Sequence, residues 1–345
     1  MNTRNMKILI TGIAGFIGFH LAKKLNDEGH EVAGIDNMND YYSPQLKTDR
    51  LKELGFHFNL PADIRDNEIY TSGRISFSKT DICDAAALQQ VFSKTEFDIV
   101  INLAAQAGVR YSIKNPSVYI QSNITGFFNI LECVRASSKK CDLIYASSSS
   151  VYGNNKVPFS AEDKTDEPVS VYAATKKANE ALANAYAALY GMSCTGLRFF
   201  TVYGPWGRPD MAYFSFTEKI LKGESIDVFN NGDLLRDFTY IDDITDGICA
   251  VVKNKKPVTD KPYYHKIYNI GNNSPVKLLD FINTISRLLG KEAAINMKPM
   301  QPGDVYATFA DILEIQNDYG FQPTFTIESG LSKFIEWYQS YYNKD

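Results

Sequence analysis

The sequence predicts an α/β protein built on a doubly wound parallel sheet, with a smaller C-terminal α/β lobe. Its 345 residues are enough for about two domains. Its first half alternates short apolar runs with amphipathic stretches of helix length, and a glycine-rich turn joins the first run to the first helix. Such alternation requires crossover connections, which make neighbouring strands parallel and place helices on both faces of the sheet.

Each expected element follows from its local pattern of apolar residues. The expected strands are 7–11, 31–35, 75–79, 98–103, 142–146 and 193–197, and the helices between them are 15–28, 85–93, 117–137 and 170–190. Residues 37–74 form an excursion longer than an ordinary connection, and loops of that length tend to be functional or mobile. After about residue 198 we expect four shorter helices, at 213–222, 242–253, 277–289 and 327–342.

This change of pattern divides the chain. We assign residues 1–198, completed by part of 235–255, to one domain and residues 199–345 to a substrate lobe.

Composition excludes several classes of protein. Hydrophobic residues make up 44% and charged residues 22%, as in ordinary soluble domains, and a net charge of −4 argues against nucleic acid or an anionic membrane as partner. No apolar run approaches the ~18 residues of a membrane span. Five cysteines without a C-x-x-C pair, and four histidines outside any metal-spaced cluster, predict a reduced, cytoplasmic protein with no metal site.

Gly12, Gly15 and Gly18 form a G-x-x-G-x-x-G turn between the first strand and the first helix. Glycine lets the backbone approach a pyrophosphate closely, and the N–H groups at a helix start bind its oxygens. Asp36 ends the second strand, where a carboxylate accepts hydrogen bonds from the adenosine ribose and repels a 2′-phosphate. The pattern predicts a Rossmann-type, NAD-binding domain over 1–198, against the alternative of a merely structural turn. Asp81 either meets the adenine or caps the helix that follows.

The second candidate group combines a tyrosine, a lysine and a serine run. Of two Tyr-x-x-x-Lys pairs, Tyr152 and Lys156 enclose a turn sequence, whereas Tyr172 and Lys176 stand four apart in an alanine-rich helix and are neighbours there. An ammonium beside a phenol lowers the phenol's pKa, as a general base requires. Serines 147–150 follow a strand's carboxyl end, where one can relay a proton. The alternatives are an ordinary surface tyrosine and a commonplace serine turn.

Seven motifs spread over the chain now suggest a family. They are TGIAGFIG (11–18), NLAAQAG (102–108), SSSSVYG (147–153), YAATK (172–176), RFFTVYGPWGRPDMA (198–212), LLRDFTYIDD (234–243) and QPGDVYATFAD (301–311). Together they resemble the extended short-chain dehydrogenase/reductase family, and within it the nucleotide-sugar epimerases. DNMNDYY (36–42), QAGVRYS (106–112) and the threonine of RFFT resemble bacterial UDP-glucuronate 4-epimerases most.

The resemblance implies a role for each matching residue. Tyr172 is implied as catalytic base, Lys176 as the residue that tunes it and Ser148 as proton relay. The implied NAD-binding residues are Gly12, Ala14, Gly15, Phe16, Ile17, Gly18, Asp36, Asn37, Asp81, Ile82, Leu103, Ala104, Ala105, Tyr172 and Lys176. The implied UDP-sugar-binding residues are Arg110, Ser149, Ser150, Thr201, Arg208, Met211, Arg236 and Asp304. Among these, Arg236 clamps the diphosphate and Asp304 accepts from the uridine ribose, while Gln301 replaces a second arginine common in the family.

Two serines select the reaction. Related dehydratases carry Asp-Glu before the Val-Tyr-Gly motif and decarboxylases carry a glutamate there, but here Ser149 and Ser150 cannot donate a proton as a carboxylic acid does. The reaction that remains is removal and return of the C4 hydride through a 4-keto sugar. In it Tyr172 takes the proton of the 4-hydroxyl. A 4-keto glucuronate is a β-keto acid, so the carboxylate must be held away from the alignment that releases CO2. Thr201, Ser149, Ser150, Arg208 and Arg110 are the candidates to hold it.

Two alternatives stay open. One is 4-epimerisation of a neutral sugar nucleotide such as UDP-glucose or UDP-N-acetylglucosamine, and Thr201 together with the 36–42 segment argues against it. The other is a non-catalytic, NAD-binding regulatory protein of the same fold, which should lack the tyrosine, lysine or serine. The helices at 117–137 and 170–190 resemble those with which the family forms a homodimer.

Overall fold

The structure is a computed structural model that describes residues 5–254, 256–301 and 305–342. By internal contacts the chain forms two compact units, each described by itself below. The first unit comprises Met1–Gly153, Lys164–Arg198 and Ile248–Tyr268, and the second comprises Asn154–Asp163, Phe199–Gly247 and Asn269–Asp345.

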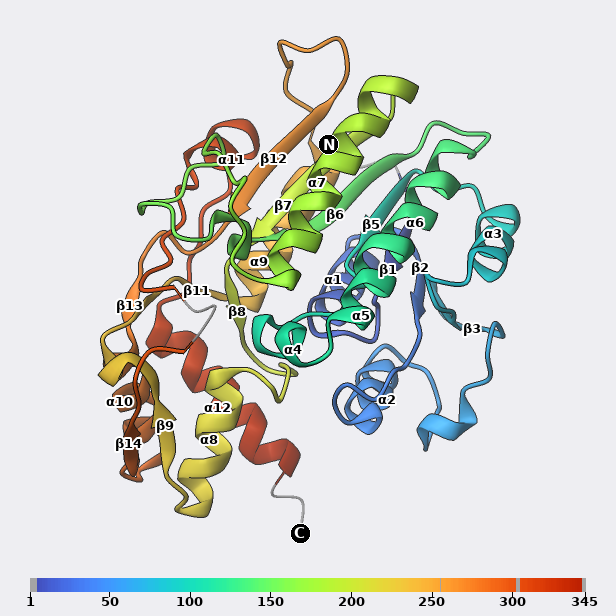
Figure 1. Cartoon of the computed structure of the whole chain (residues 1–345). Coiled ribbons are helices and arrows are strands. Elements are labelled where there is room, and N and C mark those ends of the chain that lie inside the picture. Colours follow the sequence, from blue (N-terminus) through green and yellow to red (C-terminus); the bar gives the residue numbers. More distant parts are fainter. Residues whose placement is uncertain (1–4, 255, 302–304, 343–345) are drawn as a thin grey trace. The chain divides into compact units, whose positions relative to one another are not determined.

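An eight-stranded sheet carries the first unit, in the order β12-β7-β6-β5-β1-β2-β4-β3 (Figure 1). These strands are β1 (Lys7–Thr11), β2 (Glu31–Asp36), β3 (Ile69–Ser72), β4 (Ile75–Lys79), β5 (Ile99–Asn102), β6 (Asp142–Ser148), β7 (Ser193–Phe199) and β12 (His265–Ile270). β1 pairs in parallel with both β2 and β5, and the parallel pairs β2–β4 and β5–β6 extend the sheet on either side. The strand order therefore reverses direction at β1, where ligands of open α/β sheets bind. The expected doubly wound parallel sheet is confirmed.

Helices cover this sheet on two sides (Figure 1). The helices of this unit are α1 (Phe16–Asp27), α2 (Pro44–Glu53), α3 (Ala85–Lys94), α4 (Val109–Lys114), α5 (Pro116–Tyr119), α6 (Gly126–Arg135), α7 (Val171–Tyr190) and the part of α9 (Ile241–Lys253) from Ile248 on, with short segments η1 (Pro61–Asp63), η2 (Ile120–Thr125) and η3 (Ser149–Tyr152). Apolar side chains of α3, α6 and α7 form one buried cluster with the strands, including Leu88, Phe127, Leu143 and Ala183. Burial of this face explains why the amphipathic pattern predicted α3 and α7 correctly.

Three expectations about the first unit need correction. The helix expected at 117–137 is α5, then the π-helix η2, then α6, because polar contacts of Asn123 open the middle turn. The excursion at 37–74 is not one loop, since it holds α2, η1 and the antiparallel edge strand β3. β6 continues through Ser148, so the first two serines of the run belong to the strand rather than to the turn after it.

The second unit contains three two-stranded pairings. β8 (Thr201–Tyr203) pairs in parallel with β11 (Phe238–Tyr240), β9 (Ile226–Val228) pairs in parallel with β14 (Ile295–Met297), and β10 (Leu235–Arg236) pairs antiparallel with β13 (Val276–Lys277). Its helical segments are α8 (Ala212–Lys222), α10 (Leu278–Leu289), α11 (Leu313–Tyr319), α12 (Ile327–Tyr342) and η4 (Phe229–Gly232). α8, α9, α10 and α12 confirm the four expected helices to within one residue at each end.

A buried carboxylate ties several segments of the second unit together. Asp237 is fully buried, and its oxygens accept hydrogen bonds from the backbone N–H groups of Asn272, Asn273 and Ala310 at 2.8, 3.1 and 3.0 Å. Burial raises the pKa of Asp237 to about 6, although these three donors act in the opposite direction. Asp237, which lies between β10 and β11, therefore ties this segment to two connections that are distant in the chain.

Within the residues that the structure describes, we find no helix with both the length and the apolar character that crossing a membrane requires.

Candidate active site

The glycine turn has a geometry that only glycine permits. Gly12 has a φ of +78°, and its N–H donates to the carbonyl of Ile35 at 2.7 Å. A Cβ on Gly18 would lie 2.1 Å from the carbonyl oxygen of Gly12. None of the described side chains caps the start of α1 at Gly15. The N–H groups of the first turn, from Phe16 through Gly18, therefore suit the pyrophosphate of a dinucleotide.

Asp36 lies at the end of β2 and is buried. Its Oδ1 accepts from the N–H of Met38 at 2.8 Å and from the buried Nζ of Lys47 at 3.4 Å. Nδ2 of Asn37 donates to Oδ2 of Asp81 at 3.0 Å. The structure thus brings together three residues that were expected to hold the adenosine part of NAD, and it adds Lys47, which the sequence analysis did not single out.

The helix-cap alternative for Asp81 is wrong. The cap of α3 is Asp84, whose Oδ1 accepts from the N–H of Ala87 at 3.0 Å. Asp81 instead accepts from the N–H of Cys83 at 2.8 Å and from Asn37. Its carboxylate stays at the carboxyl end of β4, beside Ile82, which is buried.

The excursion at 37–74 supports the glycine turn directly. Arg50 of α2 is fully buried, and its Nη1 donates to the carbonyl of Ala14 at 2.8 Å and to the hydroxyl of Tyr42 at 2.7 Å. The guanidinium also lies 5.3 Å from the centroid of the Tyr42 ring. Arg50 therefore joins α2 and the 36–42 segment to the turn, and the sequence analysis missed it because its partner in the turn, Ala14, is distant in the chain.

The segment after β5 lies beside the same turn. The N–H of Ala104 donates to Oγ1 of Thr11 at 3.0 Å, and the N–H of Leu103 donates to the carbonyl of Thr11 at 3.2 Å. Ala105 is half-buried with them. The next residue, Gln106, donates through its N–H to Oδ1 of Asn123 at 2.8 Å. Leu103, Ala104 and Ala105 thus follow the strand next to β1, as expected for residues that line a dinucleotide.

Tyr172 and Lys176 lie one turn apart near the start of α7. Ser170 caps this helix by accepting from the N–H of Ala173 at 3.1 Å. Tyr172 is half-buried, with its ring 6.1 Å from that of Tyr119 in an edge-on arrangement. Lys176 is buried, and its Nζ donates to the carbonyl of Ala146 at 2.8 Å. Burial lowers the pKa of Lys176 to about 8, so its charge is sensitive to nearby groups.

In the other tyrosine–lysine pair the two side chains lie in different surroundings, as the turn sequence between them suggested. Tyr152 is buried in η3, whereas Lys156 is exposed beyond it.

Ser148 ends β6 and Ser149 and Ser150 begin η3. Oγ of Ser148 accepts from the N–H and from the hydroxyl of Ser150, at 3.2 and 2.9 Å. Ser149 and Ser150 are half-buried, and Arg110 is exposed on α4. These small hydroxyls can donate to or accept from a sugar, but none can serve as a carboxylic acid.

The remaining expected sugar-nucleotide residues belong to the second unit. Thr201 begins β8, and its N–H donates to the carbonyl of Asp237 at 3.2 Å. Nη2 of Arg208 donates to Oδ2 of Asp210 at 3.1 Å and contacts Sδ of Met211 at 3.2 Å. Arg236 donates through Nη1 to the carbonyls of Leu235 and Tyr306, at 2.9 and 3.0 Å. Asp304 lies outside the described residues.

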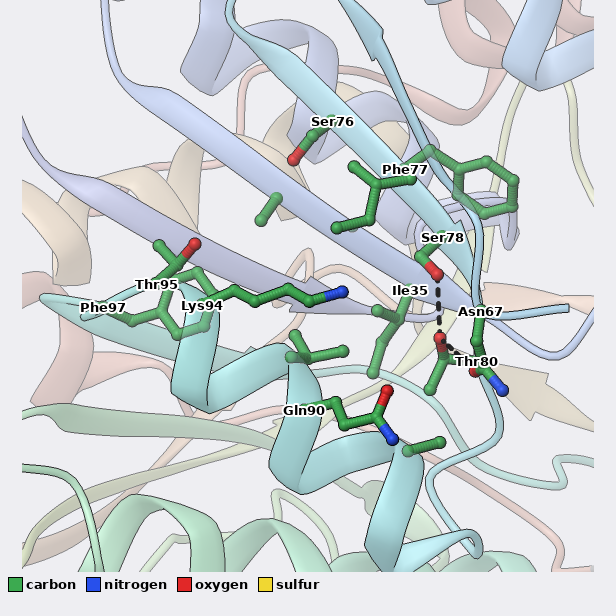
Figure 2. Close-up of a pocket in the computed structure, with 15 residues that line it drawn as sticks. Ile35, Asn67, Ser76, Phe77, Ser78, Thr80, Gln90, Lys94, Thr95 and Phe97 are labelled. Carbon is green, nitrogen blue, oxygen red and sulfur yellow. Dashed lines mark hydrogen bonds between the residues drawn. The ribbon is translucent and has the colours of Figure 1, made fainter.

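A pocket in the first unit is lined by other residues, two of which, Ile35 and Thr80, immediately precede Asp36 and Asp81. It is bordered by β2, β4 and α3, and Figure 2 shows Phe77, Thr80, Gln90 and Lys94 around it. Oγ1 of Thr80 and Oγ of Ser78 lie 3.0 Å apart at its edge. None of the residues expected to bind NAD or a sugar nucleotide lines it. In the described parts of the chain, no group of three or more histidine, cysteine or acidic side chains is placed to hold a metal ion.

Comparison with known proteins identifies the family. The model of the NAD dependent epimerase/dehydratase family matches residues 8–271. Protein CapI of Staphylococcus aureus is 52% identical over 98% of this chain and 100% of its own length. UDP-glucuronate 4-epimerase 3 of Arabidopsis thaliana is 46% identical over 99% of this chain and 78% of its own. The crystal structure of UDP-glucuronic acid 4-epimerase from Bacillus cereus, in complex with UDP-glucuronic acid and NAD, superposes with a TM-score of 0.85 at 33% identity, covering 98% and 100% of the two chains.

The family match agrees with the motifs, with the strand order and with the glycine turn. It confirms the resemblance to nucleotide-sugar epimerases and the expected dependence on NAD. The chain belongs to the NAD dependent epimerase/dehydratase family.

Proposed function

We propose that this chain catalyses the NAD-dependent 4-epimerisation of a UDP-sugar, and that the sugar nucleotide is UDP-glucuronate, converted to UDP-galacturonate. The observation that carries the proposal is the placement of Tyr172, Lys176 and Ser148 around one helix face and one strand end, with serines at 149 and 150. Relatives similar over nearly the whole chain are named UDP-glucuronate 4-epimerases, which supports the choice of substrate.

In this proposal the first unit holds the cofactor and the second holds most of the sugar nucleotide. Backbone N–H groups of the Gly12–Gly18 turn bind the pyrophosphate, Asp36 accepts from the adenosine ribose, and Asn37, Asp81 and Ile82 border the adenine. Lys176 binds the nicotinamide ribose, next to the 103–105 segment. When bound, NAD supplies a reversible hydride acceptor.

The proton chemistry falls to Tyr172. As phenolate, which the Lys176 ammonium stabilises, Tyr172 takes the proton of the sugar's 4-hydroxyl, and Ser148 orients that hydroxyl and relays the proton. The 4-keto sugar then rotates to present its opposite face. Tyr172 returns the proton to the 4-oxygen, so that the 4-hydroxyl re-forms in the opposite configuration. The same residue thus serves as base and then as acid, so the enzyme ends each turnover in its starting state.

The uronate carboxylate requires its own binding group, because a β-keto acid loses CO2 when its carboxylate aligns with the ketone. We assign this role to Ser149, Ser150 and Arg110 of the first unit and to Thr201 and Arg208 of the second. Met211, whose sulfur contacts Arg208, is assigned to sugar-nucleotide binding without a role toward the carboxylate. Arg236 and Asp304 are assigned to the diphosphate and the uridine ribose.

The deciding experiment offers the purified protein one UDP-sugar at a time, without added NAD, and separates the products by anion-exchange chromatography. We expect UDP-glucuronate to yield UDP-galacturonate, with little or no turnover of UDP-glucose or UDP-N-acetylglucosamine. Turnover of the neutral sugars alone would replace the proposed substrate by the neutral alternative. Absence of turnover with every sugar, in protein shown to contain NAD, would instead favour the regulatory alternative.

We also propose a homodimer formed through α5, η2, α6 and α7. Several large apolar side chains of these elements are exposed, namely Ile120, Phe128, Leu189 and Tyr190. A second copy would cover such side chains. Light scattering after gel filtration should give twice the 38.7 kDa of one chain, and Phe128→Lys should give a single-chain mass. A wild-type mass of one chain would refute the dimer.

We place the protein in the cytoplasm. The five cysteines are thiols outside any disulfide, and four of them are buried, as suits a compartment that keeps thiols reduced.

A further inference from the structure

An ion pair is buried on the same helix face as Tyr172 and Lys176. Glu180 stands four residues after Lys176 on α7, so Tyr172, Lys176 and Glu180 follow one another along one side of the helix. Its Oε1 accepts from Nε of Arg198 at 2.8 Å, and its Oε2 accepts from Nη2 at 2.9 Å. Both side chains are only 3% exposed. The bidentate arrangement fixes the two groups in orientation as well as in distance.

The same pair holds the serine segment at both ends. Oε1 of Glu180 accepts from the hydroxyl of Ser147 at 2.6 Å. Nη1 of Arg198 donates to the hydroxyl of Tyr152 at 2.9 Å, and the guanidinium lies 4.7 Å from that ring's centroid. Ser148 stands between Ser147 and Tyr152 in the chain. Ser147 near the end of β6 is therefore anchored to α7, and Tyr152 at the end of η3 is anchored to β7, on either side of the expected proton relay.

A buried ion pair is seldom kept for stability alone, because desolvating two charges costs about as much as their attraction returns. Its position next to Lys176 suggests an electrostatic use. Burial lowers the pKa of Lys176 to about 8, and the negative charge of Glu180 acts in the opposite direction. A buried ammonium at this place thus depends on the carboxylate one turn away.

Three neighbouring titratable groups stay uncharged around neutral pH. Burial raises the pKa of Cys194 to about 12 and that of Tyr145 well above its usual value, so both stay neutral. Burial also lowers the pKa of His265 to about 4, which keeps its ring uncharged. Tyr119 packs against Tyr172, and Tyr152 accepts from Arg198. The charges that matter here are those of Lys176, Glu180 and Arg198.

We propose that Glu180 and Arg198 are a charge-balanced pair of positioning residues, which keeps Lys176 as an ammonium beside Tyr172 and fixes the Ser148 strand end against the same helix. This inference rests on the roles proposed above for Tyr172, Lys176 and Ser148. Loss of Glu180 and loss of Arg198 should therefore have opposite effects on the charge of Lys176. Loss of the carboxylate leaves a cation that disfavours the Lys176 ammonium, whereas loss of the guanidinium leaves an anion that favours it.

The test measures NAD affinity by calorimetry between about pH 6 and pH 9.5, using the full chain and no sugar nucleotide. Because Lys176 is proposed to bind the nicotinamide ribose as an ammonium, wild-type affinity should fall as the pH rises through about 8. Glu180→Gln should move this midpoint down by about one pH unit, and Arg198→Gln should move it up by about one unit. The double variant, neutral again, should return to the wild-type midpoint. A wrong choice of sugar substrate would not alter these curves.

Midpoints that move in the same direction in both single variants, or that stay at the wild-type value while circular dichroism shows a folded chain, overturn the proposal. A double variant that keeps the midpoint of Glu180→Gln overturns it as well. If a single variant does not fold, the double variant carries the test, and a folded double variant whose midpoint lies more than about half a unit from wild type contradicts the proposal.

Discussion

Replacement of Arg50 by methionine tests whether α2 supports the glycine turn. Methionine keeps much of the aliphatic stem but removes donors to the carbonyl of Ala14 and the hydroxyl of Tyr42, at 2.8 and 2.7 Å. Hydrogen bonds from a charged donor contribute about 1.5–3 kcal/mol each, and a buried carbonyl left without a donor costs about 1–3 kcal/mol. Because methionine burial offsets part of this loss, we expect the free energy of unfolding to fall by about 3 kcal/mol.

The effect should reach the cofactor, because Ala14 lies inside the turn expected to bind the pyrophosphate. We expect the Kd for NAD to rise about tenfold or more, which corresponds to ~1.4 kcal/mol of binding free energy. Urea unfolding of NAD-free protein and calorimetric titration with NAD measure the two quantities separately.

Arg74→Met is the matched control. Arg74 also donates to a backbone carbonyl, that of Asn26, at 3.3 Å, but it is exposed. Its replacement should change unfolding by less than about 0.5 kcal/mol and leave NAD binding unaltered. The reasoning is refuted if Arg50→Met matches this control in both measurements.

Three further substitutions test separate steps. Tyr172→Phe should abolish turnover while bound NAD, read from absorbance of the denatured supernatant, stays at the wild-type level; retained turnover would remove the base assignment. Arg208→Leu should slow epimerisation or release CO2 with a UDP-pentose as product, and normal turnover without CO2 would show that Arg208 does not hold the carboxylate. Gly18→Ala puts a Cβ 2.1 Å from the Gly12 carbonyl oxygen, a backbone atom, so NAD binding should weaken about tenfold or more. Unchanged binding would mean that the backbone of the turn shifts to accommodate the methyl group without loss of NAD affinity.

Elements set by local pattern could be predicted, and those set by distant partners could not. The pattern of apolar residues predicted strands such as β1 and helices such as α7. An element that is buried on one face repeats its apolar residues with its own structural period. β12 was missed, since its place beside β7 depends on a pairing between segments about seventy residues apart. The π-helix η2 was missed for a related reason. Asn123 bonds there to Thr175, 52 residues away, and no periodicity records that contact.

The candidate site shows the same division. The glycine turn and the Tyr172–Lys176 pair are short-range patterns, so their residues could be named from spacing alone. Glu180 had a weak signal, because it continues the same four-residue spacing, but its partner Arg198 belongs to a different element, β7. Arg50 and Lys47 gave no local signal, since a basic residue on a polar helix is usually solvated.

These basic residues also show that the negative net charge of the chain does not describe its interior near the candidate site. Among the described residues, the buried lysines and arginines are Lys47, Arg50, Lys176 and Arg198, and all belong to the first unit. Each contacts a group at or next to the candidate site, namely Asp36, the Ala14 carbonyl, the Ala146 carbonyl and Glu180. A net charge of −4 therefore coexists with a cationic interior around the expected cofactor.

The partners of these cations indicate what they do. Two bind carboxylates and two bind backbone carbonyls, so each cation holds a piece of the polypeptide. They set the glycine turn, the end of β2 and the end of β6 in place, which is the pre-organisation that a dinucleotide site needs. Recognition of the sugar nucleotide's diphosphate must then depend on arginines that are not buried in this way, and Arg236, only half-buried, is the residue to which the proposal assigns it.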